Sequence, residues 1–439
     1  MRDGGRFPMS YVIAAPEFMT AAATDLANVA SSLNEATAAA APSTTGVAVA
    51  AADEVSAAVA TLFSRHAEAF QAVSARAAAF HAQFVRALNT AGDAYMAAEV
   101  ANSQAANNLV TNIFGSPPTA FPATQGAIFT GTPSLSAKVQ SGFLFALQGL
   151  ARYLPPSLTT QLSRLTGAVF SLEFSNTPPK LLTMLLGETV QHTTFDGMPV
   201  LQITPAHPSG HYVVALPGGD YSLEPSFFNW LDYTLMANQT GATIEVPFYP
   251  LVPQGGTAEV VVPEIASFIS MQIAQHGAPN VSVTGDSSGG NLALATVEYM
   301  VANNETVPGS MVLVSPWLDV TNSNPNIALT HDPLVNSPLI SGLIGGNQPN
   351  VPSEWAGNLP ETDYLVSPLY GSLKGLPPTY VYDGSLDSVT PDGIVLQQEA
   401  VAQGAPISFI FASGQVHDWV YLTPDGFELL PQIYRELGL

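Results

Sequence analysis

Residues 285–289 read Gly-Asp-Ser-Ser-Gly and place two adjacent serines between two glycines. Ser287 lies at the centre of a G-x-S-x-G pattern, between the β-rich residues Val-Ser-Val-Thr and the helix-forming run 290–303. This arrangement is typical of a sharp strand-to-helix turn that raises a serine hydroxyl above a sheet, where it can attack a carbonyl carbon. The alternative interpretation is an ordinary Gly/Ser turn without chemistry.

The second serine, Ser288, does not occupy the centre of the pattern. Its backbone N–H follows the expected nucleophile, so we expect it to donate to the oxyanion that forms during acyl transfer. Gly218 and Gly219 follow a predicted strand and supply the other two expected oxyanion donors. Asp220 fits this loop poorly, because a carboxylate about 6 Å from a developing oxyanion costs roughly 3 kcal/mol at an effective dielectric constant of about 20.

A histidine base can be chosen from chain order. Folds with this serine turn order their triad as serine, acid and histidine, and only His331 and His417 follow Ser287. Asp387 is the preferred acid because it ends the β-rich run 377–387, and only His417 comes after it. Asp383, inside the same run, is the alternative acid, and we expect His331 to be an ordinary loop residue.

Two more aspartates adjoin these candidates in the sequence. Asp286 precedes Ser287, and we expect it to be a structural turn residue. Asp418 follows His417 directly, a position from which a carboxylate could hardly orient the imidazole ring.

The elements that must position these residues alternate between strand and helix from about residue 186 onward. The β-rich runs are 212–219, 242–251, 281–288, 310–319, 377–387 and 407–417, and the clearest helical runs are 257–276, 290–303 and 390–403. Such alternation predicts an α/β fold, a mostly parallel sheet with helices on both faces. Sites in such folds lie at the carboxyl ends of the strands, where the candidate residues occur.

The N-terminal part, residues 9–110, is alanine-rich and predicts an antiparallel helical hairpin. Pro16 and Glu17 suit the first turn of one helix, and 41–46 is a turn signal before the second. Apolar residues recur at near-heptad spacing in both helices. The two apolar stripes either face each other or, as we favour, bind a helical partner protein, because two helices alone bury little surface.

Residues 111–185 are rich in proline and connect the hairpin to the α/β domain at 186–439. Two short apolar helices are predicted at 142–154 and 157–172. The segment is either a linker that packs on the following domain, which we favour slightly, or a cap over a substrate pocket.

Composition narrows the possible functions of the 439-residue chain. Its net charge of −23 disfavours binding to nucleic acid or to an anionic membrane surface. The absence of cysteine excludes disulfides, zinc-thiolate sites and thiol nucleophiles. No apolar run is long enough to predict a membrane-spanning helix, and Pro16 and Glu17 interrupt any secretory signal core.

The last 250 or so residues resemble the hormone-sensitive-lipase-like branch of the α/β-hydrolases. The motifs that carry this resemblance are GDSSGG at 285–290, Tyr-Pro-Leu-Val-Pro at 249–253, SPWLD at 315–319, the segment 367–387 and VHDW at 416–419. The resemblance implies acyl-ester hydrolysis without a cofactor or metal, with Ser287, Asp387 and His417 as the triad. The family's H-G-G-[GA] loop reads P-G-G-D here, which puts rate and substrate preference in doubt.

The first 100 or so residues resemble the mycobacterial PE domain. Pro16-Glu17 matches the name-giving pair, and Tyr95 and Glu99 match the Y-x-x-x-D/E type VII secretion signal. This resemblance implies a PPE-family partner on the hairpin, export by type VII secretion, and a location at the cell envelope or outside the cell.

These observations predict a secreted serine esterase or lipase that hydrolyses acylglycerol-type esters. Ser287 would attack the ester carbonyl, His417 would move the proton, and Asp387 would hold the imidazole. The alternative hypothesis is a catalytically silent surface interaction protein on a hydrolase scaffold, which Pro217 and Asp220 support.

Overall fold

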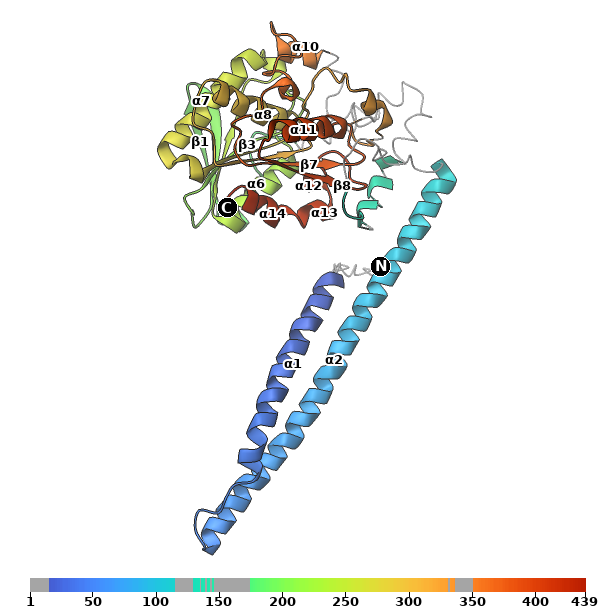
Figure 1. The fold of residues 1–439 in the computed structure, drawn as a ribbon, viewed down its shortest axis with the longest axis vertical. Helices are drawn as coiled ribbons and strands as arrows, with labels where there is room; N and C mark the ends of the chain where they lie inside the picture. The colour runs from blue at the N-terminus through green and yellow to red at the C-terminus, as the bar shows by residue number, and fades with distance from the viewer. Residues whose placement is uncertain are drawn as a thin grey trace, which may run out of the picture. The chain divides into compact units, whose positions relative to one another are not determined.

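A computed structural model describes most of the chain. The described residues are 16–114, 129–145 apart from 135, 139 and 143, 174–330, 332–335 and 350–439. The chain forms two compact units, Met1–Ala105 and Ala106–Leu439. Each is described here by itself (Figure 1).

The first unit is an antiparallel pair of long helices, α1 (Pro16–Thr45) and α2 (Glu54–Phe114). Three contacts between the helices fix their opposed directions. The His81 ring bonds to the Leu26 carbonyl, the Gln71 amide donates to the Thr37 carbonyl, and the Val47 N–H donates to Ser64 Oγ. Residues early in α1 therefore meet residues late in this part of α2, as the predicted hairpin requires.

The predicted turn at 41–46 is wrong in position. Residues 41–45 complete the last turn of α1, and the connection to α2 follows at 46–53. Thr44 and Thr45 hydroxyls donate to the carbonyls of Ala40 and Ala41, one turn earlier. These bonds satisfy carbonyl groups near the helix end, so this Ser/Thr segment remains helical.

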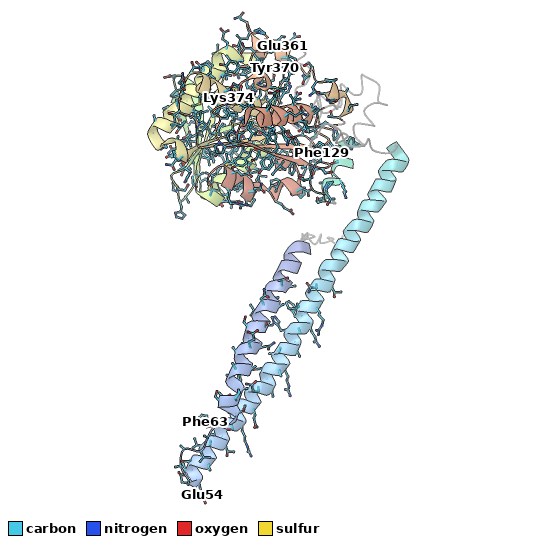
Figure 2. The ribbon with its side chains drawn as sticks, viewed as in Figure 1. Glu54, Phe63, Phe129, Glu361, Tyr370 and Lys374 are labelled. Atoms are coloured by element: carbon cyan, nitrogen blue, oxygen red, sulfur yellow. The ribbon has the colours of Figure 1, made fainter. Side chains whose placement is uncertain are left out.

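The hairpin leaves most of its large apolar side chains in solvent. Among the described residues of this unit, Ala23 and Ala60 are the buried hydrophobic ones. Leu33 and Phe80 are 63% and 71% exposed, and Phe63 near the closed end is 58% exposed (Figure 2). Over the described side chains of the hairpin, the two stripes therefore do not cover each other.

The second unit is built on one eight-stranded sheet in the order β1-β2-β4-β3-β5-β6-β7-β8. Its strands are β1 (Thr189–Phe195), β2 (Met198–Thr204), β3 (Tyr212–Leu216), β4 (Thr243–Pro247), β5 (Val281–Asp286), β6 (Ser310–Val314), β7 (Thr379–Gly384) and β8 (Ile407–Ala412). β2 pairs antiparallel with β1 and β4, and the strands from β4 to β8 pair in parallel. The predicted α/β fold class is confirmed.

Helices cover both faces of this sheet (Figure 1). They are α5 (Lys180–Leu185), α6 (Phe227–Thr240), α7 (Ala258–His276), α8 (Ser287–Ala302), α10 (Val351–Ala356), α11 (Thr390–Gln403), α12 (Trp419–Leu422), α13 (Pro424–Phe427) and α14 (Leu430–Glu436). Alternate residues of β3 enter two cores. Val214 and Leu216 pack with α7 and α8, whereas Val213 and Ala215 pack with α6, α12 and α14.

The six β-rich runs and three helical runs chosen from the sequence all contain strands or helices of the structure. The elements of the second unit outside these runs include the β1–β2 hairpin, helix α6 and the short helices α5, α10, α12, α13 and α14. Most of β1 is exposed and polar, so it lacks the continuous apolar run of a central strand. The Asp196-Gly197 turn between β1 and β2 was the available signal.

Within the second unit, part of the proline-rich segment packs against β8. The Thr130 N–H donates to the Phe411 carbonyl at 2.8 Å, and the Ser413 N–H donates to the Thr130 carbonyl at 3.0 Å. Phe129 packs edge-on against Phe411, with ring centroids 5.8 Å apart. The predicted helices at 142–154 and 157–172 lie almost entirely outside the described residues. In the described part of the chain, no helix has the length and hydropathy needed to span a bilayer.

Candidate active site

Ser287 lies at a tight junction between a strand and a helix. β5 ends at Asp286 and α8 begins at Ser287, whose φ of 51° is left-handed. A Cβ on Gly289 would overlap the Leu216 carbonyl oxygen, and a Cβ on Gly285 would overlap the Gly289 carbonyl. Both flanking glycines are therefore required by close backbone approach, and the strained turn leaves Ser287 half-buried above the sheet.

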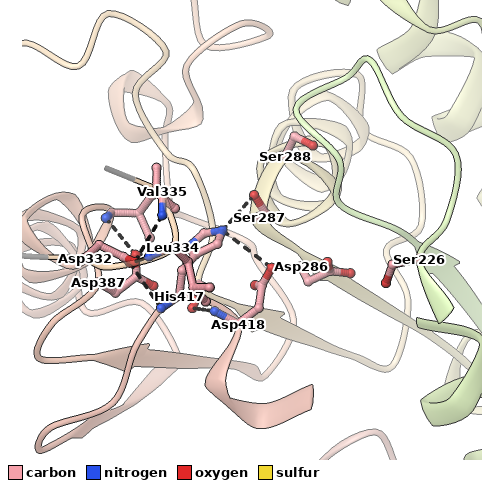
Figure 3. Close-up of polar contacts among 12 residues, drawn as sticks. Ser226, Asp286, Ser287, Ser288, Asp332, Leu334, Val335, Asp387, His417 and Asp418 are labelled. Atoms are coloured by element: carbon pink, nitrogen blue, oxygen red, sulfur yellow. Dashed lines mark hydrogen bonds and ion pairs between the residues drawn. The ribbon is translucent and has the colours of Figure 1, made fainter. Parts of the chain in front are cut away.

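The predicted serine, histidine and acid lie within hydrogen-bond distance of one another (Figure 3). Ser287 Oγ is 3.0 Å from His417 Nε2, and His417 Nδ1 is 2.9 Å from Asp387 Oδ1. With the proton on Nδ1 donated to Asp387, Nε2 can accept the proton of the Ser287 hydroxyl.

The three side chains come from the carboxyl ends of parallel strands. Asp387 follows β7 in a turn in which its N–H donates to the Gly384 carbonyl and its Oδ1 accepts from the Val389 N–H. His417 follows β8, and the Leu386 N–H donates to the Gln415 carbonyl at 2.9 Å. The Leu386–Gln415 bond joins the turn after β7, which carries Asp387, to the loop after β8, which carries His417.

Asp383, the alternative acid, lies inside β7, and its carboxyl makes no hydrogen bond among the described residues. Burial raises the pKa of its carboxyl well above the usual range, and the nearby Asp387 raises it further. Of the two aspartates, Asp387 is the one that bonds to the His417 ring. His331 lies outside the described residues.

The loop after β3 has an unusual backbone. Gly219 has φ 128°, and Asp220 and Tyr221 are both left-handed, with φ 54° and 51°. Ser288 braces this loop, because its buried hydroxyl accepts from the Tyr221 N–H at 3.3 Å. The Ser288 N–H itself is in the first turn of α8, where no intrahelical acceptor exists.

Gly218 lies against the buried Asp286 carboxylate. A Cβ on Gly218 would lie 2.5 Å from Asp286 Oδ2. Burial raises the pKa of the Asp286 carboxyl, and the Gly218 backbone lowers it. Asp286 Oδ1 accepts from Asn229 Nδ2 at 2.9 Å. Asp286 is therefore a buried acceptor that bonds to α6 and lies against the loop after β3, in keeping with its expected structural role.

Asp220 lies at the rim of the site. Its surface is exposed, but the protein around it excludes much of the bulk water. This partial burial raises the pKa of Asp220 to about 6, although the nearby His417 lowers it. The carboxylate is thus charged above about pH 6, close enough to His417 to interact with it.

His417 is surrounded by carboxylates that the sequence did not associate with it. The buried Asp332 Oδ2 accepts from the His417 N–H at 3.2 Å, and its Oδ1 accepts from the N–H groups of Leu334 and Val335. Asp418 Oδ2 lies 3.5 Å from His417 Nε2. Burial lowers the pKa of the His417 imidazole, but Asp387, Asp418 and Asp332 outweigh it and raise that pKa well above its usual range.

Asp332, Asp387 and His417 also place possible metal-ligand atoms within 4.8 Å of one another. The hydrogen bonds of these three residues show whether their ligand atoms are free to bind a metal. His417 Nδ1 bonds to Asp387, and both Asp332 oxygens accept backbone N–H groups. The donor set is therefore already engaged within the protein and does not fit an open metal site.

Comparison with known proteins identifies both parts of the chain. The PE family model matches residues 12–102, and a model described as alpha/beta hydrolase fold matches residues 213–421. A triacylglycerol lipase of Mycobacterium tuberculosis is 47% identical over 460 aligned residues, which cover 98% of this chain and 99% of that protein. The chain belongs to the PE-family lipases of the α/β-hydrolase fold. This family of ester hydrolases joins a PE domain to a hormone-sensitive-lipase-like domain.

Other relatives match one part of this PE-family lipase. The PE-PGRS family protein PE_PGRS3 of M. tuberculosis is 61% identical over 93 residues, 21% of this chain and 10% of that protein. A hormone-sensitive lipase homologue from a metagenome library aligns with a TM-score of 0.54 and 21% identity, covering 67% of this chain and 96% of that chain. An esterase/lipase from an uncultured bacterium aligns with a TM-score of 0.52 and 18% identity, covering 67% and 97%. At these identities the two structures support the fold.

Tyr95 and Glu99, the predicted secretion signal, fall within α2. They are four positions apart, so the helical backbone brings them to the same face, one turn from each other. Their side chains lie outside the part of the chain that the structure describes.

Proposed function

We propose that this chain is a serine ester hydrolase with Ser287, His417 and Asp387 as its catalytic triad. The observation that carries the proposal is the continuous chain of hydrogen-bond distances from Ser287 Oγ through His417 to Asp387 Oδ1. The strained strand-to-helix turn at Ser287 and the origin of all three residues at strand ends support it.

In the proposed reaction, Ser287 Oγ attacks the ester carbonyl carbon while its proton moves to His417 Nε2. Asp387 holds the ring through Nδ1 and stabilises the imidazolium. The imidazolium then protonates the leaving alcohol, which leaves an acyl group on Ser287. Water, activated by the neutral imidazole, releases the acid and restores the hydroxyl.

We propose that the backbone N–H groups of Gly219 and Ser288 hold the oxyanion. Gly218, the third donor expected from the sequence, lies against the Asp286 carboxylate, and its backbone lowers the pKa that burial raises. Its part would be to hold the loop against the base of the Ser287 turn, where a side chain has no room. Two preorganised N–H donors are sufficient for an oxyanion hole of this type.

The substrate class we propose is an acylglycerol-type ester. The support is the near full-length similarity to a protein named triacylglycerol lipase. The test is a chain-length series of nitrophenyl esters and acylglycerols with the wild type and Ser287→Ala. We expect hydrolysis that Ser287→Ala reduces by at least about a thousandfold. Equal, near-background rates for both proteins would instead favour a catalytically silent interaction protein.

We also propose that the hairpin binds a PPE-family protein and that type VII secretion exports the chain to the cell envelope. The support is the match to the PE family and the exposed apolar side chains of α1 and α2, such as Leu33 and Phe80. Co-expression with candidate PPE proteins should produce a stable complex that Phe80→Asp weakens. Tyr95→Ala should abolish export while leaving that complex intact.

A further inference from the structure

Asp418 occupies a position that its role in the backbone does not explain. It is the N-cap residue of α12, where an aspartate normally accepts a hydrogen bond from the first turn of the helix. The Asp418 side chain makes no such bond. Its Oδ2 instead lies 3.5 Å from His417 Nε2 (Figure 3). That nitrogen is also 3.0 Å from Ser287 Oγ.

The backbone holds Asp418 in this place. Its φ of 52° is left-handed, and its N–H donates to the hydroxyl of the buried Ser315 at 3.0 Å. Ser315 is itself left-handed and donates its own N–H to the Tyr382 carbonyl at 2.8 Å. Strained residues of this kind persist where the surrounding structure holds them, and they concentrate at functional sites.

The charge of Asp418 has one available partner in the described part of the chain. Its Oδ1 is buried without a hydrogen-bond partner, and no lysine or arginine pairs with the carboxylate there. A partly buried carboxylate that lacks a counter-charge is unfavourable, and burial accordingly raises the pKa of the Asp418 carboxyl well above its usual range. His417, when protonated, supplies that counter-charge at Nε2.

We propose that Asp418 is a second carboxylate partner of His417, which acts on the nitrogen that exchanges the proton with Ser287. This inference deepens the proposed ester hydrolysis and rests on it. When the Oγ–H bond of Ser287 breaks and the Nε2–H bond forms, Asp418 Oδ2 stabilises the new N–H and its charge. The proton then leaves Nε2 for the alkoxide of the leaving alcohol, which restores the neutral imidazole.

The Asp418 carboxylate also reduces the fraction of His417 that can act as a base at low pH. Only the neutral imidazole can accept the serine proton, and a nearby carboxylate favours the charged form. Other carboxylates also act on His417, so the effect of Asp418 must be separated from theirs. These groups are Asp220, Asp286, Asp332, Asp383 and Asp387. Removal of Asp418 alone should let His417 work as a base at lower pH.

The test is Asp418→Asn, because asparagine keeps the shape and tolerates a left-handed backbone. The matched control is Asp196→Asn, which makes the same change at an exposed, left-handed aspartate in the β1–β2 turn. The His417 titration is followed by NMR of the full chain labelled with ¹⁵N-histidine. It is measured in the Ser287→Ala background, so that it does not depend on activity.

We expect Asp418→Asn to lower the pH at which His417 titrates by about 1 to 3 units, and Asp196→Asn to leave it unchanged. With Ser287 present, the acidic limb of kcat/KM should move to lower pH by the same amount, with a lower plateau. A purely structural role would lower the rate without moving either titration.

An unchanged His417 titration in Asp418→Asn would overturn the proposal. If this variant does not fold, Asp418→Gly removes the carboxylate with a residue that suits a left-handed backbone, and the same shift is required. If the wild type shows no Ser287-dependent hydrolysis, the proposed function fails. The NMR titration still decides whether Asp418 acts on His417.

Discussion

The hydroxyl of Ser288 accepts a hydrogen bond from the backbone N–H of Tyr221 at 3.3 Å. Ser288 follows the proposed nucleophile, and Tyr221 follows the loop that carries the proposed oxyanion donor Gly219. The bond therefore couples the start of α8 to the loop after β3. The two adjacent serines therefore have different proposed roles: Ser287 is the nucleophile, and the Ser288 side chain positions the loop after β3.

Ser288→Ala should lower kcat by about tenfold with little change in KM. The loss of the hydroxyl leaves the Tyr221 N–H unpaired and loosens the loop, and a small displacement of an oxyanion donor reduces transition-state stabilisation. Steady-state hydrolysis of a soluble ester measures this change. Ser282→Ala is the matched control, because the buried Ser282 hydroxyl has no hydrogen-bond partner among the residues that the structure describes. Equal losses in both variants would rule out the bracing role.

Asp387→Asn should lower kcat by roughly four orders of magnitude, because the amide can no longer hold the correct His417 tautomer. Asp383→Asn should retain most of the activity, since Asp383 makes no hydrogen bond to His417. Both variants replace a buried carboxyl, Asp383 near the end of β7 and Asp387 just after it. Their kcat values, measured under the same conditions, can therefore be compared directly. The reverse ranking would move the acid role to Asp383.

Asp220→Asn should raise kcat/KM by about threefold to tenfold near pH 8. The carboxyl has a pKa of about 6, so it is charged there and opposes the developing oxyanion. Its exposed position means that salt screens the effect, so the gain should shrink at high ionic strength. Rates of ester hydrolysis at low and high salt provide the measurement. A lower rate in the variant would mean that Asp220 assists catalysis.

The second unit should be more stable near pH 5 than near pH 8. Burial raises the pKa of Glu245 and of Asp232 to about 7, well above their values in an unfolded chain. Groups with raised carboxyl pKa values favour the fold when protonated, so this stability is present at low pH and is lost as pH rises toward 7. For Glu245 the loss is on the order of 3 kcal/mol by pH 8.

Glu245→Gln should reduce that loss of stability with pH. Gln202 Nε2 donates to Glu245 Oε1, and an amide oxygen can accept the same bond. The exposed Glu259→Gln is the control. All four tryptophans lie in the second unit, so thermal unfolding followed by tryptophan fluorescence reports on this unit. If the stability of the wild type, Glu245→Gln and Glu259→Gln depended on pH in the same way, the loss of stability could not come from Glu245.

The main elements and the proposed triad could be chosen from the sequence for identifiable physical reasons. The central strands are buried on both faces, so they read as apolar runs between helical segments. Ser287 has a local signature, and chain order leaves His417 as the histidine after Asp387. β1 was missed because its exposed, polar residues lack that signature.

The surroundings of His417 could not be predicted in the same way. Asp332 bonds to the His417 backbone across 85 residues, and Asn229 bonds to Asp286 across 57. No local pattern encodes such contacts. The sequence predicts that Asp418, being adjacent to His417, can hardly orient the imidazole ring, yet the left-handed backbone places its carboxylate near Nε2. Asp418 contacts Nε2 of His417, whereas Asp387 bonds to Nδ1.

The reactivity of Ser287 is tested most directly by mass spectrometry after treatment with a fluorophosphonate, which labels serine nucleophiles that a histidine base activates. The proposed triad predicts one adduct per chain, on the peptide that contains Ser287. It also predicts loss of labelling in Ser287→Ala and in His417→Asn. Absence of an adduct on the folded wild-type protein, or an adduct that persists in Ser287→Ala, would contradict the role proposed for this serine.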